Sequence, residues 1–170
     1  MVFTGNYEHA IDAKHRIAIP SDIRRKLQRE IEGDDGQGKG SGGDRPVVLY
    51  AVLAGEETIA LYTEAGYDRL SEELRNSGLD PEELLEYEDL FYAMSQQIEL
   101  DKAGRARLPD HLLARTGLSG DVALTGAGDH LKIRDKVAWQ AKLDAKLADR
   151  PGALVNPRLL IGRRTDRAGD

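Results

Sequence analysis

A ten-residue motif occurs twice in this chain, and the repeat restricts how the chain can fold. The first copy is Ile-Asp-Ala-Lys-His-Arg-Ile-Ala-Ile-Pro at residues 11–20, and the second is Leu-Asp-Lys-Ala-Gly-Arg-Ala-Arg-Leu-Pro at residues 100–109. Both copies read apolar residue, Asp, three residues, Arg, two residues, apolar residue, Pro, at an offset of 89 positions. Half of a 170-residue chain is marginal in size for a stable core, so we expect the two copies to pack against each other.

Each copy of the motif predicts a strand, a turn, a returning strand and a helix. In the first copy, residues 3–11 and 16–19 are the strands, which would pair as a hairpin, and Asp12 opens the turn between them. Pro20 ends the second strand, and Ser21 is positioned to cap a helix with an apolar stripe. The second copy predicts strands at 97–100 and 105–108, followed by a helix capped by Asp110 that ends at Gly117.

A second strand pair follows each motif. It is predicted at 47–50 and 58–62 in the first copy and at 121–125 and 131–134 in the second, and each pair leads into a helix. Another helix, opened by Asp80-Pro81, lies between the copies. The first copy holds 17 additional residues, which the glycine-rich composition places at about 33–46 as a flexible insertion. The pattern therefore predicts an α+β fold built from one unit used twice.

The charge is unevenly distributed along the chain. The net charge is −6, but residues 12–29 hold six Lys or Arg and two acids, and residues 102–107 hold three cations and no acid. Residues 64–89 hold ten acids and two bases. A local basic surface can bind phosphate even on an acidic protein, so nucleic acid is not excluded as a partner.

The Asp and Arg of each motif stand four residues apart around the predicted turn. The carboxylate can hold the turn and also orient the guanidinium, whose fixed plane of donors suits phosphate or the O6/N7 edge of guanine. The alternative is a local ion pair with no role in binding, which contributes about 0–1 kcal/mol when exposed. Repetition of the motif with an adjacent lysine, Lys14 or Lys102, leaves both interpretations open.

Several of these residues together resemble the MraZ family of transcriptional regulators. The resemblance rests on Phe3-x-Gly5, the two Asp-x-x-x-Arg motifs with their prolines, Arg24, and Trp139 near the end, and it covers roughly residues 1–147. It implies two tandem SpoVT/AbrB-like domains of swapped-hairpin β structure with short flanking helices and a pseudo-two-fold internal repeat. The implied ranges are 6–64 for domain 1, 65–93 for a helical connector, 94–137 for domain 2, 138–161 for a C-terminal helix and extension, and 162–170 for a disordered tail.

The resemblance also implies function. It implies sequence-specific binding to repeats in double-stranded promoter DNA, commonly at the division and cell-wall gene cluster, by a homo-oligomer that is ring-like. The DNA-binding candidates it gives are Arg16 and Arg105 as the main contacts, Lys14 and Lys102 on phosphates, and Arg24, which either touches DNA or pairs with a neighbouring subunit. Asp12 and Asp101 would orient the turns. His15 departs from the family, which favours glycine at that turn position, and could add a DNA contact. Arg107 has no family counterpart and reads as a solvated strand residue.

Two other functions remain open. AbrB-type antitoxins share the hairpin fold and wrap a partner with a tail, for which residues 151–170 are a candidate. An enzyme or metal site would have to use His9, Asp12 and His15, but alternate residues of a strand face opposite sides. The sequence predicts no cofactor, no small-molecule substrate and no nucleophile–base arrangement.

The sequence also suggests where the chain works. It contains no apolar run of membrane-spanning length, no secretory signal and no cysteine. We therefore expect a cytoplasmic, nucleoid-associated protein.

Overall fold

The computed structural model describes residues 1–33, 46–55 and 57–149. The chain divides into two units, Met1–Lys136 and Val137–Asp170, which are described separately. The predicted glycine-rich insertion at 33–46, apart from its end residues, and the predicted tail lie outside the described residues.

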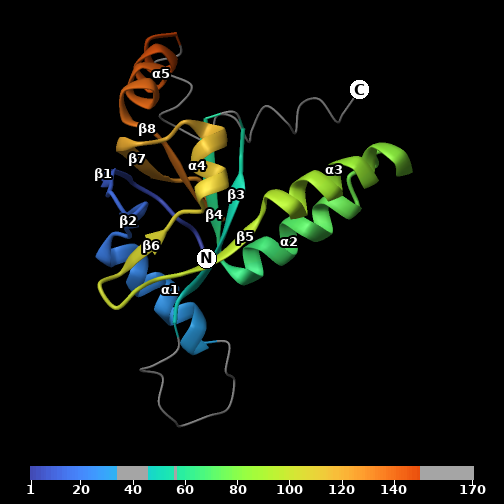
Figure 1. The fold of residues 1–170 in the computed structure, drawn as a ribbon, viewed down its shortest axis with the longest axis horizontal. Helices are drawn as coiled ribbons and strands as arrows, with labels where there is room; N and C mark the ends of the chain where they lie inside the picture. Colours follow the sequence, from blue (N-terminus) through green and yellow to red (C-terminus); the bar gives the residue numbers. More distant parts are fainter. Residues whose placement is uncertain (34–45, 56, 150–170) are drawn as a thin grey trace, which may run out of the picture. The chain divides into compact units, whose positions relative to one another are not determined.

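The predicted order of strands and helices is confirmed (Figure 1). The first copy comprises β1 (Asn6–Ile11), β2 (Arg16–Ala18), α1 (Ser21–Gly33), β3 (Val48–Leu53), β4 (Thr58–Tyr62) and α2 (Glu64–Arg75). Helix α3 (Pro81–Met94) follows. The second copy comprises β5 (Gln96–Glu99), β6 (Arg105–Arg107), α4 (Asp110–Thr116), β7 (Gly120–Gly126), β8 (His130–Asp135) and α5 (Lys136–Asp149).

The strands of the two copies are interleaved in two antiparallel sheets. One sheet has six strands in the order β1-β7-β8-β4-β3-β5, and the other consists of β2 and β6. Exchanging each strand for its counterpart in the other copy reverses the six-stranded order and otherwise leaves it unchanged, so the unit has pseudo-two-fold symmetry. The expected packing of one copy against the other is confirmed, because β1 pairs with β7, β5 with β3, and β2 with β6.

The predicted hairpin between the strands that flank each turn is wrong. β1 and β2 each pair with a strand of the second copy, and the first turn is closed by backbone bonds from the Asp12 N–H to the Arg16 carbonyl and from the His15 N–H to the Asp12 carbonyl. Pairing across the symmetry axis places Ile17 and Ala106 together in the core that the two copies share. The hydrophobic effect therefore favours the interleaved arrangement.

One hydrophobic core is shared by the two copies. Ile17 and Ala106, at the centre of the β2–β6 pair, are fully buried against it. The helices add Ile23 and Leu27 from α1 and Leu112 from α4. Burying a side chain of this size stabilises the folded state by roughly 1.5–3 kcal/mol, and both copies contribute residues to this one cluster. Neither copy can therefore keep this core alone.

The helix ends agree in part with the sequence. Asp80 caps α3, and Gly117 ends α4 in the left-handed conformation with φ 68°, as predicted. Thr63 caps α2 by accepting the Gly66 N–H at 3.1 Å. The prediction for Asp110 is wrong: Pro109 occupies the capping position without a side-chain bond, and Asp110 is the first helical residue. Ser21 is likewise the first residue of α1.

Helices α2 and α3 run side by side and pack on β3 and β4 through an aromatic cluster (Figure 1). The rings of Tyr50 and Tyr67 stack at 4.3 Å, and Tyr67 and Phe91 lie 5.7 Å apart. Phe91 and Met94 of α3 thus pack inward. Two leucines of the same helix, Leu85 and Leu90, remain 61% and 62% exposed.

Candidate nucleic-acid interface

The first turn is held by the carboxylate of Asp12. Its Oδ1 accepts the backbone N–H groups of Lys14 and Arg16, each at 2.9 Å. Its Oδ2 accepts Nε and Nη2 of the Arg16 side chain, both at 2.8 Å. A single carboxylate therefore fixes both the backbone of the turn and the plane of the guanidinium.

The second turn repeats this arrangement. Oδ1 of Asp101 accepts the backbone N–H groups of Ala103 and Arg105 at 2.9 Å, and Oδ2 accepts Nε of Arg105 at 3.0 Å. The Arg105 carbonyl accepts the Asp101 N–H at 2.8 Å, as the Arg16 carbonyl accepts the Asp12 N–H at 3.0 Å. The repeated sequence motif is thus a repeated three-dimensional device.

Both aspartates are held in the ionised form. The side-chain hydrogen bond from Arg16 is the main cause that lowers the pKa of Asp12 to about 2. The backbone N–H of Arg105 is the main cause that lowers the pKa of Asp101. Near neutral pH each arginine therefore has a permanently charged partner.

The two arginines lie on one outer face of the β2–β6 ribbon. Ile17 pairs with Ala106 and both point into the core, so the neighbouring residues on each strand point outward. The side chains of Arg16 and Arg105 are 25% and 38% exposed. Neither guanidinium is sealed inside the molecule, and both reach the same surface.

Lys14 and Lys102, the predicted phosphate contacts, are exposed on the turns. They are not equivalent, because Lys14 is the second residue after the apolar–Asp pair of its motif and Lys102 is the first. Lys14 therefore lies nearer to its arginine along the chain than Lys102 does.

Arg24 of α1 lies across the second turn and is half-buried. Its Nε donates to the carbonyl of Ile19 at 3.1 Å, and a Cβ atom on Gly104 would meet the Arg24 side chain at 2.5 Å. A side chain here would displace the end of the Arg24 side chain and would adopt a φ of 73°, which glycine reaches without strain. A groove of about 980 Å³ opens beside this turn, and its cations are Arg24, Arg25 and Lys102.

The structure adds Arg107 to the candidate face, a residue that the sequence suggested was only a solvated strand position. Arg107 pairs directly with Arg16 across the ribbon, and its side chain is 67% exposed. The alternation along β6 places Arg105 and Arg107 on one face, which could have been read from the sequence. The pairing with Arg16 could not, because it joins strands of different copies.

His15 occupies the turn position where the second copy has Gly104, with φ 59°. Its Nδ1 lies 2.7 Å from Oδ1 of Asp110, which also lies 3.4 Å from Nη2 of Arg107. The Asp12 carboxylate already accepts a hydrogen bond from the Arg16 side chain. Among the described residues, no group of three or more His, Cys, Asp or Glu side chains could hold a metal ion. His9, Asp12 and His15 are therefore not brought together as a metal site.

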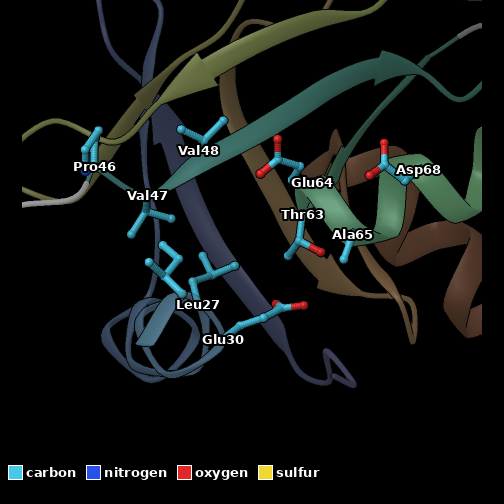
Figure 2. Close-up of a pocket in the computed structure, with 10 residues that line it drawn as sticks. Leu27, Glu30, Pro46, Val47, Val48, Thr63, Glu64, Ala65 and Asp68 are labelled. Carbon is cyan, nitrogen blue, oxygen red and sulfur yellow. The ribbon is translucent and has the colours of Figure 1, made fainter. Parts of the chain in front are cut away.

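A separate pocket of about 520 Å³ lies between the end of α1 and the start of α2, and Figure 2 shows the residues that line it. Leu27 and Val47 form part of an apolar wall, and Glu30, Glu64 and Asp68 supply carboxylates. Three carboxylates disfavour a nucleic-acid backbone. The basic turns, not this pocket, therefore form the candidate interface.

Comparison with known proteins finds one matching family and several relatives that carry the same name. Residues 91–151 match the family described as "MraZ protein, putative antitoxin-like". Transcriptional regulator MraZ of Chlorobaculum parvum is 29% identical over 153 residues, which are 89% of this chain and 87% of that protein. Over most of its length this chain is similar to proteins named as MraZ transcriptional regulators.

Further MraZ relatives match over a similar length. Transcriptional regulator MraZ of Acetivibrio thermocellus is 25% identical over 82% of this chain and 85% of that protein. That of Mycoplasmoides gallisepticum is 28% identical over 82% of this chain and 85% of that protein. These relatives match over at least 82% of this chain, whereas the family match at residues 91–151 includes the second copy of the motif. The described part of the chain has no helix with the length and apolarity that crossing a membrane requires.

Proposed function

We propose that this chain is a sequence-specific DNA-binding transcriptional regulator, with double-stranded promoter DNA as its partner. The observation that carries the proposal is the pair of carboxylate-held arginines, Arg16 and Arg105, on one outer face of the ribbon. The relatives carry the name of transcriptional regulators, which agrees with a binding protein and not an enzyme. We propose as its target a set of repeats upstream of division and cell-wall genes, which the family resemblance suggests, and with it an association with the nucleoid.

The held arginines suit base recognition. Nε of each arginine is engaged by its aspartate, so the terminal nitrogens keep donors for the O6 and N7 atoms of guanine. Because the side chain is already ordered, less conformational entropy is lost on binding. Lys14 and Lys102 would contact phosphates, which positions the ribbon without reading sequence.

The ribbon has the dimensions for a major groove. A groove about 12 Å wide admits a two-stranded ribbon. Arg16 and Arg105 stand diagonally across the strand pair, so their Cβ atoms are roughly 7–8 Å apart. That separation is about two base-pair steps of roughly 3.4 Å each. One ribbon would therefore address bases about two steps apart.

We further propose that several copies assemble, as a ring in the form that the family resemblance implies. A single ribbon has only a few base contacts, and linking several ribbons raises the overall affinity without new contacts. The exposed Leu85 and Leu90 on α3 are candidates for the subunit contact. The acidic segment of α2 and α3 would keep DNA from the opposite side of the assembly.

An antitoxin-like interaction module is the alternative, favoured by the wording of the family description. Its test is removal of the segment after Leu147. Loss of a co-purifying protein with intact DNA binding would support the alternative, and unchanged behaviour in both assays would support the regulator.

Footprinting of the wild-type chain on the region upstream of its own gene tests the proposal. We expect discrete protected boxes and an affinity that falls steeply with salt, by a log–log slope of about −0.9 for each phosphate contact. Absence of any protected box at low salt, or an affinity that does not change with salt, would contradict it.

A further inference from the structure

The two ends of the β2–β6 ribbon are related by the pseudo-two-fold axis but carry different residues. In the part of the first copy that precedes its insertion, each residue corresponds to the residue 89 positions later. One end of the ribbon holds His15, Arg107 and Asp110. The corresponding residues at the other end are Gly104, Ala18 and Ser21, none of which is charged. The backbone is symmetric here and the side-chain chemistry is not.

This end holds a connected cluster of an imidazole, a guanidinium and a carboxylate that joins both copies. Oδ1 of Asp110 lies 2.7 Å from Nδ1 of His15, and both carboxylate oxygens lie 3.4 Å from Nη2 of Arg107. The His15 carbonyl accepts the N–H of Leu108 at 2.8 Å, which ties the first turn to β6. The hydrogen bond to His15 is the main cause that lowers the pKa of Asp110. The cluster therefore holds Arg107 beside the first turn.

Arg107 stands directly opposite Arg16, and this pairing of like charges is unfavourable in itself. Each arginine has its own carboxylate, Asp12 for Arg16 and Asp110 for Arg107, and these offset the repulsion. At the other end Arg105 stands opposite Ala18. The ribbon thus presents two guanidiniums at one end and one at the other.

The cations of the other end come from different elements. Beside the second turn, the groove of about 980 Å³ is lined by Arg24 and Arg25 of α1 and by Lys102. Their counterparts beside the first turn are Leu113, Ala114 and Ala13. One end therefore places its additional positive charge on the ribbon face, where base edges would lie. The other end places it on the turn and helix, at the flank of the ribbon.

We propose that Arg107 is a specificity-determining residue, positioned by Asp110 and His15, and that it makes each protomer bind its DNA site in one orientation. This inference rests on the proposed function, because it assigns base recognition at one end of the DNA site to Arg16 together with Arg107. Arg105 reads the other end beside Ala18. The recognised duplex is therefore asymmetric although the backbone of the ribbon is nearly symmetric.

The orientation can be measured because the chain has no cysteine. Ala114→Cys places one thiol on the exposed side of α4, near Asp110, to which an iron–EDTA cleavage reagent is attached. On a duplex selected from a randomised pool, we expect strand cleavage at one end of the bound site only. Equal cleavage at both ends would overturn the proposal.

The variant that tests the residues exchanges each for its counterpart: His15→Gly, Arg107→Ala and Asp110→Ser together. We expect this variant to lose its base preference at the end of the DNA site that the reagent attached at position 114 cleaves. Its affinity for the wild-type site should fall roughly 5- to 100-fold. Preference at the other end should remain. Unchanged preference at the mapped end, or equal loss at both ends, would overturn the assignment.

Two controls separate this inference from the proposed function and from folding. Arg107→Ala alone should reproduce most of the loss of preference while its midpoint of thermal unfolding stays near that of the wild type, because Arg107 is exposed. Specific binding that survives the Arg16→Ala/Arg105→Ala change would defeat the proposed function. A wild-type chain that binds DNA through Arg16 and Arg105 but selects a palindromic site would defeat only the present inference.

Discussion

Ile17 lies directly opposite Ala106 at the centre of the β2–β6 ribbon, and neither residue has any exposed surface. This pair decides what the ribbon presents to solvent. Because alternate residues of a strand face opposite sides, burying Ile17 and Ala106 turns Arg16, Arg105 and Arg107 outward. The core contact between the two copies and the candidate DNA surface are thus two faces of one six-residue element.

The buried pair predicts the effect of truncating Ile17. Ile17→Ala should lower the free energy of unfolding by about 2–4 kcal/mol, because it removes buried methyl groups at the contact between the copies. Urea unfolding followed by circular dichroism measures the change. A loss below about 1 kcal/mol would show that the core does not depend on this contact; exposed Leu90→Ala is the matched control.

The aspartates of the turns predict opposite effects on specific and nonspecific DNA binding. Asp12→Asn removes a negative charge, so nonspecific affinity should stay constant or rise. Specific affinity should nevertheless fall, by about tenfold, because Arg16 loses the partner that fixes its plane. Titration of specific and unrelated duplexes measures both values, and a rise in both would contradict the orienting role.

Acid should destabilise the folded chain through the same aspartates. The folded-state pKa of Asp12 is lowered to about 2 and that of Asp101 is also lowered, so their contribution is present above the unfolded value and is lost as the pH falls towards the folded value. We expect the midpoint of thermal unfolding to drop between about pH 4 and pH 2. Asp12→Asn with Asp101→Asn should reduce this drop, whereas Asp89→Asn on α3 serves as a surface control. Equal pH dependence in all three proteins would contradict the assignment.

The corresponding turn positions His15 and Gly104 should respond differently to substitution. Gly104→Ala should destabilise the chain by about 1–3 kcal/mol, because φ is 73° and the new Cβ would collide with Arg24. His15→Gly at the corresponding position should change stability by about 1 kcal/mol or less, because relief of the left-handed strain opposes the loss of the Asp110 contact. Denaturant midpoints of the two variants measure the contrast, and similar destabilisation by both would contradict it.

Much of the fold was predictable because its signals are local. The Asp–Arg spacing, the proline stops and the Asp80 cap each involve residues a few positions apart, and the repeat is found by comparing two such stretches. Strand partners were not predictable, since alternation shows which side chains share a face but not which strand lies alongside. The hairpin expected around Asp12 was wrong for this reason.

The same limit applies to the candidate site. The sequence identifies Arg16 and Arg105 from their repeated motif, but the pairing of Arg16 with Arg107 requires the register of β2 on β6. Asp110 was expected to cap α4, and its carboxylate instead meets His15, 95 positions away. A side chain with several possible partners cannot be assigned one from local sequence alone.

The most direct test of the account is the affinity of Arg16→Ala/Arg105→Ala for the duplex that the wild-type chain protects. Arg69→Ala/Arg75→Ala removes the same charge from exposed positions on α2 and is the matched control. We predict that the first variant loses specific protection of that duplex while keeping the wild-type oligomeric state, and that the control binds as the wild type does. Equal binding by the two variants would contradict the claim that the held arginines read DNA.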